Sequence, residues 1–132
     1  WENTILHIAR LTDPPRSVRK DNLSIQRLLL AVDDEELAKT LNEKIDFAKE
    51  KSSFCRDWRN RRIAHRDLKL AIEMESTPLA PASRKAVKEA LSSIVDVLDT
   101  VSLRYQNSTT LFSLPLGSGG GESLLQLLDE TT

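Results

Sequence analysis

The fold is decided by the stretch AVKEALSSIVDVLDTVSLRY, residues 86–105. Its apolar side chains recur in alternating steps of four and three positions, and this spacing places them on one face of an α-helix. The residues on this face are Val87, Leu91, Ile94, Leu98, Val101 and Tyr105. The pattern predicts a long helix with a coiled-coil-like seam that packs against other helices. Residues 77–83, which contain two prolines, mark where this helix begins.

A first helix is expected at the start of the chain and must end before the double proline at residues 14–15, because the residue before a proline disfavours helical geometry. The residues of its apolar face are Trp1, Ile5 and Ile8. A polar loop over residues 16–20 is expected to follow. After that loop, Asp21 or Asn22 is predicted to cap a short helix that runs through Val32.

The longest helix is expected to begin at the four carboxylates of residues 33–36, because negative charge is favourable at a helix N-terminus. From there apolar residues recur near helical spacing toward His65. They are Leu37, Leu41, Ile45, Ala48, Cys55 and Trp58. Taken together, these segments predict an all-α fold, an antiparallel bundle of four to five helices.

The domain organisation follows from the glycines, which all lie within residues 117–121. We expect residues 1–113 to form one helical bundle and residues 114–132 to form a Gly-rich linker with a short amphipathic tail. Because the first residue is Trp1 and not Met, we expect the natural start, and an N-terminal helix with it, to be truncated.

Composition excludes several classes of protein. The net charge of the 132 residues is −1, so no overall field attracts the chain to nucleic acid or membrane. A single cysteine excludes an internal disulfide, and no apolar run approaches the ~20 residues that cross a bilayer, so we expect a cytoplasmic protein. Two distant histidines and one cysteine give no metal-ligand spacing, and we predict neither a metal site nor a cofactor.

Basic residues concentrate between Lys49 and Lys69, where the sequence contains eight basic and three acidic residues. Such a run is most often a solvated helix face. Here, however, arginines flank His65. At ~100° per residue, the sector that holds Trp58 and His65 also contains Arg61 and Arg62, at the edge of the buried face.

Arg59 points ~120° away from His65 on a straight helix. The two side chains can therefore act together only if the helix ends or bends near Ala64, or if a second subunit completes the site. A histidine can accept and donate protons near pH 7, and a guanidinium binds phosphate oxygens while it stays charged. These two groups suffice to cleave RNA without a metal, through attack of the ribose 2′-OH.

The stretch RNRRIAH, residues 59–65, resembles the motif of the HEPN superfamily (higher eukaryotes and prokaryotes nucleotide-binding). That motif is an arginine, often followed by a polar residue such as asparagine, with a histidine a few positions further on. Trp58 and the flanking stretches IARLTD (residues 8–13) and AHRDL (residues 64–68) resemble the abortive-infection branch of the superfamily. The resemblance spans roughly residues 1–105.

The resemblance implies a four- or five-helix bundle that forms a homodimer, with the motif helices at the interface. It also implies a metal-independent endoribonuclease of a toxin–antitoxin or anti-phage system, with RNA as its substrate. The expected partners are a second copy of the chain and a cognate antitoxin or nucleotidyltransferase. Carried over to this sequence, Arg59 and His65 are the expected catalytic pair and Asn60 shapes the site. The expected substrate-binding residues are Arg61, Arg62 and Arg66.

Two other functions remain open. The chain could be a non-catalytic HEPN-like module that binds RNA or a nucleotide or serves for dimerisation, or a helical interaction domain whose arginines pair with acids. His65 could equally cap helix carbonyls. Arg61 and Arg62 could form salt bridges across a dimer. Arg66 could be a solvated surface residue, His7 is expected to be structural, and Cys55 is expected to be a small core residue.

Overall fold

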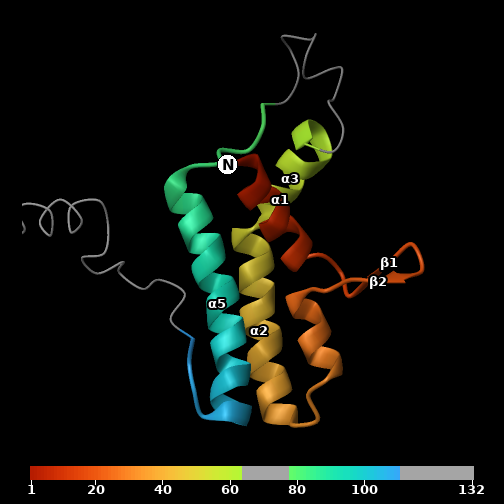
Figure 1. Cartoon of the computed structure of the whole chain (residues 1–132), viewed down its shortest axis with the longest axis vertical. Coiled ribbons are helices and arrows are strands. Elements are labelled where there is room, and N and C mark those ends of the chain that lie inside the picture. The colour runs from red at the N-terminus through yellow and green to blue at the C-terminus, as the bar shows by residue number, and fades with distance from the viewer. Residues whose placement is uncertain (64–77, 111–132) are drawn as a thin grey trace, which may run out of the picture.

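The computed structural model describes residues 1–63 and 78–110, and in these ranges the chain is a mostly helical bundle (Figure 1). Its elements are α1 (Glu2–Leu11), β1 (Arg16–Ser17), β2 (Lys20–Asp21), the 3-10 helix η1 (Ile25–Leu30), α2 (Glu35–Lys51), α3 (Ser53–Trp58), the π-helix η2 (Arg59–Ile63) and α5 (Arg84–Gln106). The fold class predicted from the sequence is confirmed. Among these described elements, no helix combines the length and the apolar composition that crossing a membrane requires.

Helices α2 and α5 form the centre of the bundle and run antiparallel (Figure 1). Lys44 Nζ of α2 lies 3.0 Å from a carboxylate oxygen of Asp96 on α5. Two turns further along α2, Lys51 Nζ lies 3.7 Å from a carboxylate oxygen of Glu89, which is two turns back along α5. Equal steps in opposite directions are what antiparallel packing requires, so these surface pairs record the register of the two helices.

The start of α2 is confirmed at the predicted cluster of carboxylates. Asp34 is its N-cap, and its Oδ1 accepts the backbone N–H groups of Glu36 and Leu37, each at 3.0 Å. The bond from the Leu37 N–H and the hydrogen-bonded guanidinium of Arg104 lower the pKa of Asp34. Because the charged carboxylate is the form that caps the helix, this contribution to stability is lost as the pH falls through the lowered pKa.

The hydrophobic core lies between α1, α2, α3 and α5, with one residue from η1. Its buried side chains are Ile5, Ile8, Ala9, Ile25, Leu37, Leu41, Ile45, Ala48, Phe54, Cys55, Val87, Ala90, Ile94 and Val97. On α5 the predicted seam is only partly correct, since Leu91 and Tyr105 are exposed while Ala90 and Val97 are buried. A small side chain such as Ala90 at a helix contact permits close approach, and the larger Leu91 is left outside the contact.

The long helix predicted from residue 33 toward His65 is interrupted at Ser52, where α2 ends and α3 begins. The Ser52 hydroxyl reaches back to the carbonyl of Ala48 at 2.7 Å, a side-chain bond that competes with helical geometry. Ser52 is buried, and its Oγ also lies 3.2 Å from the hydroxyl of Thr12 at the end of α1. The break therefore joins α1 to the α2–α3 junction.

The polar loop predicted over residues 16–20 instead forms a small hairpin, in which Arg16 pairs with Asp21 and Ser17 with Lys20. The short helix that follows is a 3-10 helix preceded by Ser24, whose side chain makes no capping bond, so the cap predicted at Asp21 or Asn22 is wrong. Asn22 instead secures the hairpin base, because its Nδ2 donates to the carbonyl of Pro14 at 2.8 Å.

Three further predictions concern the first helix, His7 and the C-terminal segment. The first helix does end before the double proline, and its Ile5 and Ile8 are buried, but Trp1 is half exposed. His7 is exposed and not a core residue, because it lies on the opposite side of α1 from the buried face. The predicted linker and the amphipathic tail lie within residues 111–132, which are outside the described part of the chain.

Replacing Leu41 with alanine should lower the free energy of unfolding by about 2–5 kcal/mol, because the side chain is fully buried between α2 and α5. Phe47 on the same helix is 52 % exposed, and Phe47→Ala is the matched control with an expected loss below about 1 kcal/mol. Urea denaturation followed by circular dichroism measures both. Equal losses for the two variants would contradict the packing described here.

Candidate functional site

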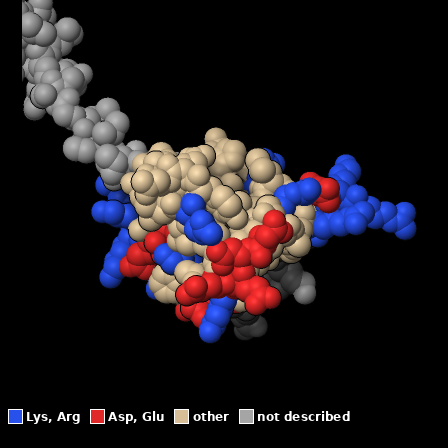
Figure 2. Space-filling view, turned by 90° about the horizontal axis from the view of Figure 1, so that it is seen from below, with Lys and Arg blue, Asp and Glu red and all other residues tan. Residues whose placement is uncertain are grey.

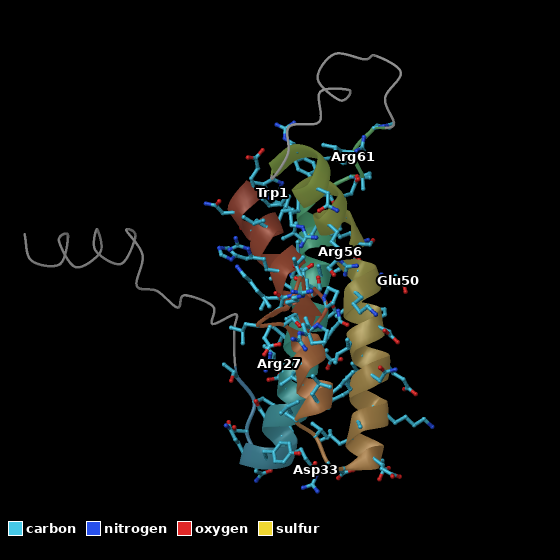
Figure 3. The ribbon with its side chains drawn as sticks, turned by 90° about the vertical axis from the view of Figure 1, so that its right-hand side faces the viewer. Trp1, Arg27, Asp33, Glu50, Arg56 and Arg61 are labelled. Carbon is cyan, nitrogen blue, oxygen red and sulfur yellow. The ribbon has the colours of Figure 1, made fainter. Side chains whose placement is uncertain are left out.

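The predicted motif lies at one end of the bundle, where α3 passes into η2. Figure 3 shows Arg61 and Trp1 toward this end and Asp33 at the opposite end. Residues Arg59–Ile63 form a π-helix, which is rare in proteins and is frequent at functional sites. Regular α-helical geometry therefore ends at Arg59, and the angular relation of a straight helix does not apply beyond it.

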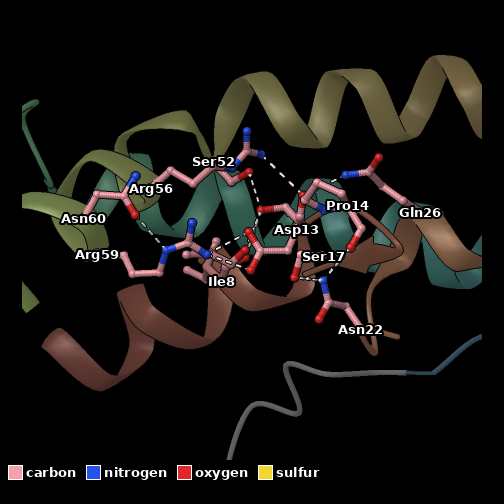
Figure 4. Close-up of polar contacts among 12 residues, drawn as sticks. Ile8, Asp13, Pro14, Ser17, Asn22, Gln26, Ser52, Arg56, Arg59 and Asn60 are labelled. Carbon is pink, nitrogen blue, oxygen red and sulfur yellow. Dashed lines mark hydrogen bonds and ion pairs between the residues drawn. The ribbon is translucent and has the colours of Figure 1, made fainter. Parts of the chain in front are cut away.

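Arg59 is held by the carboxylate of Asp13 (Figure 4). Its Nη1 donates to both oxygens of that carboxylate, at 2.7 and 2.6 Å, and its Nε donates to Oδ1 of Asn60 at 3.1 Å. The two side chains of the ion pair are 23 % and 20 % exposed, so the pair is largely removed from water. Such a pair fixes the guanidinium in one position.

The position of Asp13 follows from the buried polar cluster beside it. The carbonyl of Thr12 accepts hydrogen bonds from Gln26 Nε2 at 2.9 Å and from Arg56 Nη2 at 3.3 Å. The Thr12 side chain is buried and bonds to the Ile8 carbonyl at 3.0 Å. Because α1, η1 and α3 all contribute to these contacts, the backbone that carries Asp13 is fixed from three sides (Figure 4).

Arg61 and Asp57 connect the motif to the segment that precedes α5. Arg61 Nη1 lies 3.3 Å from Asp57 Oδ1, and Asp57 Oδ2 accepts the backbone N–H of Ala80 at 3.0 Å. Trp58 Nε1 donates to the carbonyl of Ala80 at 2.7 Å. Arg61 is thus part of a structural contact in this chain, which accounts for its half-buried position without a ligand.

Arg62 is the most exposed of the three motif arginines. Its Nε donates to a carboxylate oxygen of Glu2 at 3.1 Å, and its guanidinium lies 5.5 Å from the centre of the Trp58 ring. Both partners are intrachain, from α1 and α3. About half of the side chain remains exposed, so Arg62 can exchange Glu2 for another anion at little cost.

The structure brings Arg59 and Asn60 together and places Arg61 and Arg62 beside them. Residues 64–77 lie outside the described part of the chain, so the positions predicted for His65 and Arg66, and the bend predicted near Ala64, are not described. The roles assigned to all six residues stay predictions.

From the sequence, acids are expected only as one alternative set of partners for the arginines, and Asp13, Glu2 and Asp57 are not identified as those acids. Asp13 is assigned only to the stretch that resembles the family, and Glu2 and Asp57 are assigned no role. One signal was available: three arginines near the edge of a buried face require nearby anions. The sequence could not show which acids those would be, because Asp13 and Glu2 come from the other end of the chain.

Cys55 is buried in the core as predicted, and burial raises the pKa of its thiol to about 11. The folded state therefore favours the neutral thiol, and its contribution to stability declines as the pH rises from the ordinary value of 9.0 through about 11. A raised pKa and a buried position both argue against a nucleophilic role.

Alkylation of Cys55 by a thiol reagent at pH 8 should be at least about 100-fold slower in the native protein than in the urea-unfolded protein, because the folded thiol carries far less thiolate. The chain has one cysteine, so the unfolded protein is its own control. A native rate equal to the unfolded rate would show that Cys55 is not buried.

Asp13→Asn should lower the free energy of unfolding by about 1–3 kcal/mol, since it leaves the largely buried Arg59 guanidinium without its counter-charge. The matched control is Asp21→Asn, which removes the exposed pair with Arg27 and should cost about 0–1 kcal/mol. Denaturant titration measures both. If Asp13→Asn costs no more than the control, the ion pair does not hold the motif.

A comparison with protein families identifies one relationship, and it extends over nearly the whole chain. The family model described as HEPN AbiU2 matches residues 1–120. Searches of curated proteins and of solved structures return no significant match. The matched range includes α1, the central helices and the RNRRIAH motif, so the chain belongs to the HEPN AbiU2 family, an abortive-infection branch of the HEPN proteins.

Proposed function

We propose that this chain is a metal-independent endoribonuclease that acts as a toxin or in anti-phage defence. The observation that carries the proposal is the geometry of Arg59, whose guanidinium is fixed by Asp13 and Asn60 at the first residue of the motif. An anion-binding group that is already oriented needs no reorganisation when charge develops on a substrate. Membership of an abortive-infection family supports the defence context.

The guanidinium of Arg59 is held in place, but not all of its N–H groups make hydrogen bonds within the described residues. Its Nη1 and Nε atoms carry the bonds to Asp13 and Asn60, whereas Nη2 makes no hydrogen bond within the described residues. An arginine presents five N–H donors, so two remain on Nη2 for a phosphate oxygen. Asp13 therefore acts as a positioning residue, and in this proposal Arg59 contacts the scissile phosphate.

In the proposed reaction His65 removes the proton of a ribose 2′-OH. The 2′-oxygen then attacks the adjacent phosphorus, the new O2′–P bond forms, and the P–O5′ bond breaks. The 5′-oxygen takes a proton from water as it leaves, His65 returns its proton to the solvent, and the products are a 2′,3′-cyclic phosphate and a 5′-OH end. Arg59 stabilises the charge that accumulates on the non-bridging phosphate oxygens.

The proposed assembly is a homodimer in which the motif ends of two copies face each other, with an antitoxin or nucleotidyltransferase as a further partner. Arg62, which is exposed and is held by a surface pair with Glu2 and a contact with the Trp58 ring, would then contact RNA near the joint site. Arg66 is proposed for the same role. Arg61 is the weakest of the proposed substrate contacts, because Asp57 already holds it.

One observation favours the alternative function, a non-catalytic HEPN-like module for RNA binding or dimerisation. Each of Arg59, Arg61 and Arg62 is paired with an acid of the same chain. Paired arginines present less net positive charge than the sequence suggests, so they attract RNA less strongly. The proposed endoribonuclease forms a cleaved RNA product, whereas the non-catalytic module forms none.

The test is cleavage of a pool of single-stranded and structured RNA in EDTA, with the product ends mapped. His65→Ala should reduce the cleavage rate by about 10²–10⁴-fold, the usual contribution of a general base. The matched control is His7→Ala, which replaces the other histidine of the chain at an exposed position on α1 and should leave the rate unchanged.

Wild-type protein that binds RNA without cutting it would move the assignment to the non-catalytic alternative. Cutting that survives His65→Ala at the full rate would overturn the assigned base. The comparison with His65→Ala requires that this variant unfolds at the same urea concentration as the wild type, which urea denaturation measures.

A further inference from the structure

The hairpin formed by β1 and β2 carries a concentration of exposed cations. Arg16, Arg19 and Lys20 lie within five positions and are all exposed. Within residues 1–63 and 78–110 none of their side chains forms an ion pair, whereas the three motif arginines do. Val18 between them is 94 % exposed.

The hairpin projects from the side of the bundle. Seen from below, acidic side chains gather on the lower half of this end of the molecule, beside a broad area without charged side chains, and basic side chains extend from the edge where Figure 1 draws β1 and β2 (Figure 2). The positive charge of the hairpin therefore stands apart from the body of a chain whose net charge is −1.

The base of the hairpin is fixed although its tip is exposed. The Asn22 side chain donates to the carbonyl of Pro14 at 2.8 Å and to the hydroxyl of Ser17 at 3.1 Å, and the Asn22 backbone N–H donates to the carbonyl of Pro15 at 2.9 Å. On the other strand, Asp21 forms an ion pair with Arg27 at 3.3 Å. The direction in which the cations project is thus set by the fold.

The two residues of the turn are not those that this turn geometry favours. Val18 and Arg19 have φ angles of 46° and 64°, in the left-handed region where Asn-Gly is the preferred pair. A β-branched residue there is unfavourable by roughly 1–3 kcal/mol. Turn stability therefore does not explain a Val-Arg tip.

We infer that this hairpin is an RNA-binding arm, in which Arg16, Arg19 and Lys20 contact phosphates of the strand whose scissile phosphate is held by Arg59. The inference rests on the proposed function. Asp13, which holds Arg59, is three residues before Arg16, so one short segment positions both the motif arginine and the arm. Unpaired cations on a fixed projection are suited to phosphate contacts along a strand.

The number of residues between Asp13 and the tip of the hairpin sets an upper limit on the distance between the motif and the arm. Arg19 is six residues from Asp13, so the tip lies within about 22 Å of it at ~3.6 Å per residue. At ~3.4 Å per nucleotide of one strand this distance corresponds to about six nucleotides. A 12-nucleotide RNA, about 41 Å long at this spacing, is therefore long enough to occupy both the motif and the arm, whereas a trinucleotide of about 10 Å spans less than half of that maximum distance.

The test measures the affinity of a fluorescent 12-nucleotide single-stranded RNA and of a trinucleotide between 50 and 200 mM salt. His65→Ala is the background, so that no cleavage occurs. The variant R16Q/R19Q/K20Q removes three contacts, each contributing ~0.7 to the salt slope of a single strand. Between 50 and 200 mM salt, its affinity for the 12-mer should fall by a factor about 20 times smaller than the affinity of the His65→Ala protein falls. Its affinity for the trinucleotide should equal that of the His65→Ala protein.

Three further variants separate contact from general charge. K39Q/K44Q/R104Q removes the same number of charges from α2 and from the end of α5, and should keep most of the wild-type salt slope. R16K/R19K/K20R keeps the charges of the arm and should also keep the slope. V18N/R19G retains a favourable turn, so the hairpin remains folded, and should lower the slope by ~0.7.

The outcomes distinguish this inference from the proposed function. Equal salt slopes for the arm variant and for K39Q/K44Q/R104Q would overturn the arm and leave the endoribonuclease standing. Absence of any RNA binding and cleavage by the wild type would overturn both. An arm that instead binds an acidic protein would show wild-type RNA affinity in all the variants, and that result also overturns the inference.

Discussion

The carboxylate of Asp13 receives the Arg59 guanidinium at the point where α1 has ended and the hairpin is about to begin, and most of the site depends on this contact. Asp13 cannot shift freely, because the carbonyl of its neighbour Thr12 is bonded to η1 and α3 and the Thr12 hydroxyl lies against Ser52. One ion pair thus ties the motif to the first helix, and the buried polar cluster beside it ties the first helix to the α2–α3 junction. A largely buried charge stays stable only with such a counter-charge.

Much of the fold could be predicted because its signals are local. The end of α1 before the double proline and the start of α2 at Asp34 follow from nearest-neighbour chemistry. The break at Ser52 could not be predicted in the same way. Serine is tolerated inside helices, and what favours the break is a contact with Thr12, forty residues earlier. The hairpin was missed for a related reason, because its strands have two residues each and its turn lacks the usual glycine.

The residue types of the candidate site could be predicted from the sequence, but the distribution of charge over the folded site could not. Between Lys49 and Lys69 the sequence carries a strong positive balance, and this suggested a basic surface. In the structure Asp13, Glu2 and Asp57 neutralise the motif arginines. Two of these acids belong to the first thirteen residues, so no window of sequence around the motif contains them. Unpaired positive charge lies instead on the hairpin, which the sequence presented as an ordinary polar loop.

The motif arginines are paired with acids, whereas the hairpin cations are not, and this difference has a physical consequence for any reaction at the motif. An arginine that is anchored by a carboxylate is well oriented, but the same carboxylate cancels part of its attraction for a polyanion. Orientation and affinity therefore compete at Arg59. A chain of net charge −1 can satisfy both requirements only if the attraction comes from cations that are not paired and that stand away from the acidic body. The hairpin meets this condition, and its attachment next to Asp13 makes the two requirements separable. In the proposed function, substitutions on the arm would change how strongly an RNA strand is held, whereas substitutions at Asp13 would change how the scissile phosphate is oriented.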